Sequence, residues 1–198
     1  MNWQAEPHYS ITDYLKNEQH SDTKHEYLNG EVYAMAGASK NHQHIILNLS
    51  SLFRTHLKNT PCDTFASDIK LKIGDLATFY PDVMVTCEQD NENDYYITKP
   101  TIIVEVLSKS TRRTDETTKR QLYQTLPSLK EYVLIEQDIV DIEICRSNNH
   151  WQPEHYFMGD EITFEAIDLT VFVNDIYERV QNDDVQTFFE NLKTEIMP

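Results

Sequence analysis

Apolar residues recur along this chain with helical spacing in some stretches and with strand spacing in others. In residues 39–58 they return every three or four positions, which predicts a helix that begins near Ser39 or Asn41. In residues 68–73 apolar and polar side chains alternate, which predicts a strand with one face of each kind. The chain therefore mixes both kinds of element.

Turn residues and short apolar runs add further elements to this pattern. Asn29-Gly30, inside HEYLNGEVYAMA, predicts a β-hairpin with a type I′ turn. The remaining expected elements are helices at 10–19, 112–126, 171–180 and 185–193, and strands at 81–87, 101–107, 131–136, 139–145, 151–157 and 161–164. The polar link 88–99 is expected to be a surface loop.

The order of these elements predicts an α/β fold with a mixed central sheet. Its core is expected to run helix-strand-strand-strand-helix-strand, with an N-terminal β-hairpin before it and additions at the C-terminal end. A length of 198 residues fits a single domain spanning 1–198, with residues 174–198 as an acidic helical C-terminal segment.

Composition favours a protein of the cytoplasm that does not enter membranes. No apolar run approaches the roughly 20 residues of a membrane helix, and the start MNWQAEPHYS lacks the features of a signal peptide. The three cysteines are widely spaced and odd in number, which argues against a disulfide framework and for a reducing compartment.

The net charge of −16 is unusual for a protein that binds nucleic acid, so its distribution matters. Residues 136–198 carry a net charge of −12, and residues 1–135 carry only −4. Between positions 105 and 130 six basic residues face three acidic ones. The locally basic segment thus follows directly after a strand that contains a carboxylate, although a solvated helix face explains it equally well.

Two carboxylates stand in or beside the apolar strands. Glu105 lies in the middle of IIVEVL, where burying it unpaired costs several kcal/mol. It must therefore pair with a cation, bind a metal or titrate at higher pH. Asp82 follows Pro81 at the start of a second strand, where a turn role is the common one. On neighbouring strands the two predict a site for a hard divalent cation.

Several blocks of this sequence resemble a known family. Pro81-Asp82, the run Glu105-Val106-Leu107-Ser108 and the element order resemble the PD-(D/E)XK nuclease superfamily. More narrowly, HEYLNGEVYAMAGAS, NHQHIILNL and TIIVEVLSKSTRRTDETTKRQLYQTLPSLKEYVLIE are similar to the Uma-two family of predicted restriction endonucleases. The resemblance covers a nuclease-like region from about residue 24 to 173.

The resemblance implies a restriction-endonuclease-like fold and Mg²⁺, with Mn²⁺ as an alternative, held by Asp82 and Glu105. It implies metal-dependent hydrolysis of phosphodiester bonds. This chain departs from the superfamily pattern at Leu107, which occupies the lysine position of E-x-K. We expect Lys119, on the following helix, to replace that lysine as the third catalytic residue. An Asp115–Lys119 surface pair explains the same spacing equally well.

Further candidates surround this set. Glu26 and Glu31 flank the hairpin turn, and one of them, with Glu26 slightly favoured, is expected to face the metal; a solvent-facing strand position is the other explanation, above all for Glu31. His42 could contact phosphate or transfer a proton, although capping or packing explains it better. Asp68 is a third carboxylate candidate or an anchor for its strand. Lys70 and Lys72 are second choices for the catalytic lysine.

The sequence therefore predicts a Mg²⁺-dependent endonuclease that cleaves DNA, as a homodimer because duplex cutting needs two sites or two events. Two alternatives remain open. The first is a catalytically inactive nuclease-fold module for binding or regulation, which Leu107 and the net charge favour. The second is a metal hydrolase for small phosphoesters, which needs no basic groove.

Overall fold

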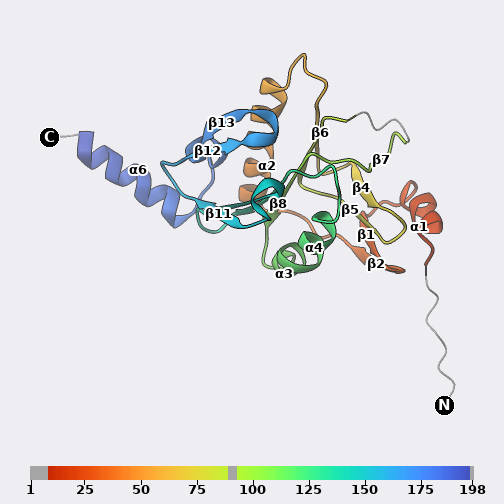
Figure 1. The fold of residues 1–198 in the computed structure, drawn as a ribbon. Coiled ribbons are helices and arrows are strands. Elements are labelled where there is room, and N and C mark those ends of the chain that lie inside the picture. Colours follow the sequence, from red (N-terminus) through yellow and green to blue (C-terminus); the bar gives the residue numbers. More distant parts are fainter. Residues whose placement is uncertain (1–8, 89–92, 197–198) are drawn as a thin grey trace.

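A six-stranded mixed sheet forms the centre of the fold, in a computed structural model that describes residues 9–88 and 93–196 (Figure 1). Its strands, in the order β11-β10-β9-β8-β6-β3, are β3 (Asp63–Ala66), β6 (Val83–Thr86), β8 (Ile102–Leu107), β9 (Glu131–Glu136), β10 (Ile142–Arg146) and β11 (Pro153–Tyr156). Strands β8 and β9 are parallel, and their neighbours run antiparallel. The expected mixed sheet is confirmed.

Helix α2 (Lys40–His56) covers one face of this sheet. Ser39 caps it by accepting a hydrogen bond from the His42 N–H, as the sequence predicts. Ile45, Leu49 and Phe53 of α2 are fully buried in one core with the valines of β6 and β8 that point toward the helix. The order α2-β3-β6-β8-helix-β9 has the predicted succession of helix, three strands, helix and strand, but its first strand is β3 and not the expected strand at 68–73.

The helix between β8 and β9 is not the continuous α-helix that the sequence predicts. It consists of α3 (Arg112–Thr114), a π-helical turn η1 (Asp115–Lys119) and α4 (Arg120–Tyr123). The Arg120 N–H reaches back to the carbonyl of Asp115, and the Tyr132 hydroxyl donates to the same oxygen at 2.9 Å. A side chain from β9 thus helps to satisfy the widened turn.

A second, five-stranded sheet lies on the other face and shares a hydrophobic core with β6, β8 and β9. Its strands, in the order β2-β1-β5-β4-β7, are β1 (His25–Leu28), β2 (Glu31–Ala34), β4 (Lys70–Ile73), β5 (Ala77–Phe79) and β7 (Tyr96–Ile97). Asn29 and Gly30 both have positive φ, as a type I′ turn requires. Helix α1 (Ile11–Glu18), capped by Ser10, packs on β1 through stacked Tyr14 and Tyr27.

Three predictions for this region are wrong. The strand near 68–73 belongs to the second sheet, and β3, which the sequence analysis missed, takes its place beside β6. Lys70 is buried rather than on a polar face, because its ammonium lies 5.2 Å from the centre of the Tyr80 ring. The link 88–99 contains strand β7, although residues 89–92 lie outside the described part.

The C-terminal part adds a two-stranded sheet, β12 (Glu161–Phe164) and β13 (Leu169–Phe172), then α5 (Val173–Ile176) and α6 (Asp183–Ile196). Residues 171 and 172, where a helix is predicted to begin, therefore belong to β13, because this strand pairs with β12. Figure 1 shows α6 extending away from the sheets at the end opposite α1. Within the described ranges, none of the helices is both long and apolar enough to cross a membrane. Residues 1–8, most of the segment considered for a signal peptide, lie outside them.

The cysteine prediction is also wrong, since Cys62 and Cys87 form a disulfide. The two residues are 25 positions apart in sequence, but they extend the antiparallel pairing of β3 with β6 by one position beyond Asp63 and Thr86. Strand pairing, which cysteine spacing does not reveal, brings them together. Cys145 is buried and free. The cysteine argument for a reducing compartment is thereby lost.

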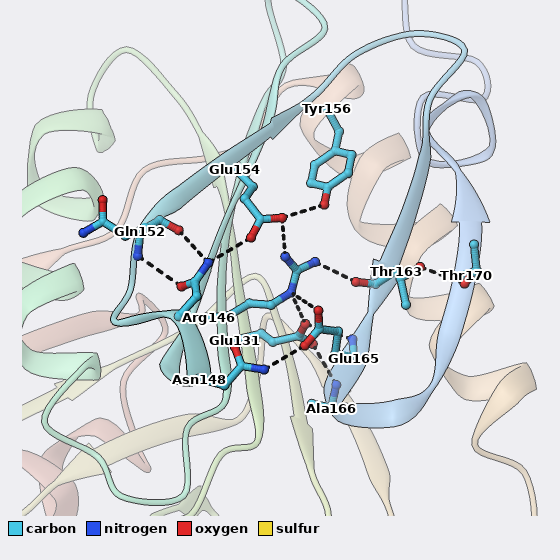
Figure 2. A network of polar contacts seen from close by, with 11 residues as sticks. Glu131, Arg146, Asn148, Gln152, Glu154, Tyr156, Thr163, Glu165, Ala166 and Thr170 are labelled. Atoms are coloured by element: carbon cyan, nitrogen blue, oxygen red, sulfur yellow. Dashed lines mark hydrogen bonds and ion pairs between the residues drawn. The ribbon is translucent and has the colours of Figure 1, made fainter.

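A charged network around Arg146 ties the central sheet to the β12–β13 sheet (Figure 2). The Arg146 guanidinium lies 3.1 Å from Glu131 and 2.7 Å from Glu154, and it donates to the Thr163 carbonyl at 2.8 Å. Glu131, only 1% exposed, also accepts the backbone N–H of Glu165 at 2.9 Å. This buried carboxylate is thus fully paired and serves the architecture.

Candidate active site

Asp82 and Glu105 face each other across strands β6 and β8. The antiparallel pairing joins Val83 to Val104, so the next pair along the register is Asp82 with Glu105. Directly opposed residues point to the same face of a sheet. That face carries the core shared with the second sheet, and the valines point to α2.

The helical segment after β8 supplies the cation of this site. Asp115, Lys119 and Tyr123 are the buried residues of η1 and α4, and they share the side that meets the sheet. The Lys119 ammonium lies 3.3 Å from Glu105 Oε1 and 3.1 Å from Asp115 Oδ1. Asp115 and Lys119 thus form a buried pair rather than the alternative surface pair.

Glu26, on β1, completes the contacts of Lys119 from the second sheet. Its Oε1 lies 3.0 Å from the ammonium and also accepts the backbone N–H of Tyr80 at 3.3 Å. One ammonium therefore meets three carboxylates from three separate elements. Lys119 also lies 5.4 Å from the centre of the Phe79 ring, so apolar surface closes the remaining side.

Tyr123 is a site residue that the sequence analysis did not select as a candidate. Its hydroxyl donates to Glu105 Oε1 at 2.8 Å, and its ring is fully buried. The sequence did contain a signal for Tyr123, because it follows Asp115 and Lys119 at i, i+4 and i+8 on one face of the helix. An apolar ring at that spacing is ordinarily explained by packing, which hides the role of the hydroxyl.

Asp82 is held by one backbone hydrogen bond and lies beside a histidine ring. Its Oδ2 accepts the backbone N–H of Val106 at 2.7 Å and lies 3.2 Å from His42 Nε2. The Asp82 side chain is 17% exposed, whereas that of Glu105 is 4% exposed. The Glu26 side chain is 16% exposed, so solvent reaches this cluster at both Asp82 and Glu26.

Burial and mutual repulsion set the protonation of the cluster. Burial raises the pKa of Glu105 well above its ordinary value, the Lys119 charge opposes this rise, and the Asp115, Asp82 and Glu26 carboxylates add to it. Burial likewise raises the pKa of Asp115. The three surrounding carboxylates more than offset the effect of burial on Lys119 and raise its pKa.

Three predicted residues lie away from this cluster. Lys72 pairs with Asp75. Asp68 is exposed and pairs with Lys24. Lys70 lies against Tyr80, whose hydroxyl donates to Glu18 of α1 at 2.9 Å. The structure thus brings together Glu26, His42, Asp82, Glu105, Asp115 and Lys119, and it leaves Asp68, Lys70 and Lys72 outside.

The donor set fits a hard divalent cation that keeps several of its water ligands. Glu26, Asp82, Glu105 and Asp115 bring four carboxyl groups beside one lysine and one histidine, and burial raises the pKa of two of them, Glu105 and Asp115. In the described part of the chain, no three His, Cys, Asp or Glu side chains form a group that could hold a metal. Mg²⁺ is commonly bound by one or two carboxylates plus waters and substrate phosphate, which two carboxylates can provide.

Comparison with known proteins identifies the family. Residues 11–171 match the sequence profile of Uma2, described as "Putative restriction endonuclease". The chain belongs to the Uma2 family. Two "uncharacterized" proteins of Synechocystis sp. are each 38% identical: slr1290 over 86% of this chain and 92% of its own length, and sll1609 over 72% and 80%.

The fold of this Uma2 protein also has a counterpart among solved structures. A "putative nuclease belonging to DUF820" from Anabaena variabilis superposes with a TM-score of 0.71 at 16% identity. The match covers 87% of this chain and 99% of that one. Because the identity is this low, the match establishes the fold alone, which is restriction-endonuclease-like.

Proposed function

We propose that this Uma2 protein is a metal-dependent endonuclease that hydrolyses DNA phosphodiester bonds. The observation that carries the proposal is the pairing of Asp82 with Glu105 across β6 and β8, beside a buried lysine that comes from the next helix. Burying a carboxylate inside an apolar strand costs free energy, so such a residue is a candidate for a functional site.

Asp82 and Glu105 would hold Mg²⁺, or Mn²⁺ in its place. When bound, such an ion activates a water and neutralises charge on the phosphate and the leaving oxygen. Lys119 would hold Glu105 in place, and its charge opposes the rise that burial causes in the pKa of Glu105. Glu26 and Asp115 hold the Lys119 ammonium from the other two sides. Lys119 thus replaces the missing lysine at the position of Leu107.

The exposed residues beside the site suit a nucleic-acid backbone. Lys109 and Arg113 follow β8 and are both exposed. Phosphate contacts by such side chains supply much of the affinity for DNA and make it depend on salt.

A plasmid assay with matched variants tests the proposal. Glu105→Gln removes the candidate metal ligand, and Glu131→Gln removes an equally buried, ion-paired glutamate on β9 that lies outside the site. We expect the wild type and Glu131→Gln to nick supercoiled DNA with Mg²⁺ or Mn²⁺ and to stop when EDTA is added. Glu105→Gln and Asp82→Asn should be inactive. Nicking by folded Glu105→Gln at the wild-type rate would refute the proposal.

The alternative of an inactive binding module has one observation in its favour. Lys119 already meets three carboxylates, so the buried charge of Glu105 is compensated without a metal. This alternative predicts that neither Mn²⁺ nor Mg²⁺ raises the melting temperature of the wild type. A small-phosphoester hydrolase would instead bind the metal and cleave bis(p-nitrophenyl) phosphate while leaving DNA intact.

Homodimer formation is a further part of the proposal, because cutting both strands of a duplex needs two sites or two events. Light scattering coupled to size-exclusion chromatography, with and without DNA, measures the mass directly. A mass of twice the 23.3 kDa chain is expected.

A further inference from the structure

Each carboxylate of the candidate metal pair has one oxygen engaged and one oxygen open. Asp82 Oδ2 accepts the Val106 N–H at 2.7 Å, and His42 Nε2 lies 3.2 Å from the same oxygen. Glu105 Oε1 takes both the Tyr123 hydroxyl and the Lys119 ammonium, at 2.8 and 3.3 Å. Within residues 9–88 and 93–196, Asp82 Oδ1 and Glu105 Oε2 have no such partner.

We propose that His42 and Tyr123 are positioning residues, each holding one oxygen of a metal-binding carboxylate and leaving the other oxygen for the cation. The inference rests on the proposed function and adds two residues to it. A carboxylate held by one oxygen in this way cannot rotate its other oxygen away from the cation. The neighbours that orient metal ligands commonly matter nearly as much as the ligands themselves.

Tyr123 can place its hydroxyl in one position only. Its ring packs edge-on against Phe79, with centroids 5.7 Å apart, and against Tyr132, with centroids 5.4 Å apart. The ring is fully buried, so the hydroxyl cannot swing to another acceptor. Glu105 Oε1 is therefore met by a donor whose location is set by packing.

His42 is fixed by the start of α2. Its backbone N–H donates to the capping Ser39 Oγ at 3.1 Å, which sets the first turn of the helix. The Nδ1 atom of its ring is buried and, in the described part of the chain, has no hydrogen-bond partner. The His42 ring therefore makes its polar contact with Asp82 through Nε2, while its buried Nδ1 stays unpaired. A histidine that served only packing would have no need for this arrangement.

Tyr123→Phe tests the Glu105 contact with minimal change of volume. Tyr132→Phe is the matched control, since it removes a buried hydroxyl from the neighbouring ring that donates to the Asp115 carbonyl and not to Glu105. We expect Tyr123→Phe to weaken Mn²⁺ binding, measured by calorimetry, about ten-fold. Tyr132→Phe should stay within about two-fold of the wild type. Equal affinities for Tyr123→Phe and the wild type would overturn the role of Tyr123.

Three variants test the Asp82 contact. His42→Ala removes the ring nitrogen beside Asp82, His42→Gln can place an amide N–H near the position of Nε2, and His44→Gln changes another histidine of the same helix. We expect Mn²⁺ affinity to fall about ten-fold in His42→Ala, to recover in His42→Gln, and to be unchanged in His44→Gln. A His42→Gln protein as weak as His42→Ala would assign His42 to packing and overturn its role.

A metal-free measurement separates this inference from the proposed function. Three-bond NMR couplings report whether the Asp82 side chain keeps one χ1 rotamer. We expect one rotamer in the wild type and His42→Gln, and rotamer averaging in His42→Ala. If the wild type binds no Mn²⁺, the proposed function fails, and these couplings still decide whether His42 positions Asp82. A single rotamer in His42→Ala would overturn that claim. Thermal unfolding of every variant identifies any loss of binding that comes from loss of the fold.

Discussion

Lys119 Nζ lies 3.3 Å from Glu105 Oε1, and the two residues are 14 positions apart on opposite sides of a helix–sheet contact. Both are almost completely buried. An ion pair in such a place contributes little net stability when intact, but removal of one partner leaves an uncompensated buried charge. Predictions for this site follow from that asymmetry.

Lys119→Met should lower the free energy of unfolding by about 3–5 kcal/mol, because Glu26, Glu105 and Asp115 then repel one another without a cation. Urea denaturation measures the loss. Added Mn²⁺ should stabilise this variant more than the wild type if the carboxylates bind the ion. Arg120→Met, which removes an ion pair with Glu143 outside the site, is the control.

The stability of the protein should fall as pH rises through the pKa of Glu105. Burial raises that pKa above its ordinary value of 4.5, so between the two values the folded state keeps a proton that the unfolded state has lost. The contribution of this carboxyl is present below pH 4.5 and is lost as pH rises through the folded pKa. From pH 5 to pH 8 the wild type should lose this contribution and Glu105→Gln should not, so we expect the free energy of unfolding of Glu105→Gln to increase relative to that of the wild type. A difference that stays constant over this range would contradict the assignment.

Sequence patterns predicted much of the fold because the signals were local. Asn29-Gly30 needs only its own backbone geometry to form the hairpin turn, and the Ser39 cap needs only the His42 N–H. The apolar run around Glu105 likewise identified a buried strand. Asp82 and Glu105 could be grouped because both lie in or beside such runs.

What the sequence did not reveal depends on contacts between distant elements. Lys70 is buried because Tyr80 faces it across β4 and β5, and no local pattern shows that partner. The π-helical turn is completed by Tyr132 from the next strand. The hydroxyl of Tyr123 gains its acceptor only when the helix packs on β8.

Reduction of the Cys62–Cys87 disulfide should destabilise the fold by about 3 kcal/mol, because the bond closes a loop over 25 positions in the unfolded chain. Thermal melts with and without a phosphine reductant measure this effect. The Cys62→Ser/Cys87→Ser double variant should melt like the reduced wild type and no longer respond to reductant. Two thiols that react freely with a labelling reagent in the untreated native protein would contradict the bond.

Arg146→Met should cost about 3–5 kcal/mol, because Glu131 is then left buried without its cation. Adding Glu131→Gln should recover much of that loss, which a double-mutant cycle in urea would show. Glu131, the member of this network on β9, is three residues away from Leu134, which pairs with Glu105. The affinity for Mn²⁺ should therefore be the same in Arg146→Met and the wild type once both are folded.

The most direct test of the central claim is a crystal structure of the protein soaked in Mn²⁺, with anomalous differences recorded for the wild type and Glu105→Gln. The account predicts a strong peak contacted by the carboxylates of Asp82 and Glu105 in the wild type and its loss in Glu105→Gln. A wild-type crystal without that peak, with the Lys119–Glu105 ion pair intact, would show that Glu105 is a structural partner of the lysine and would contradict the account.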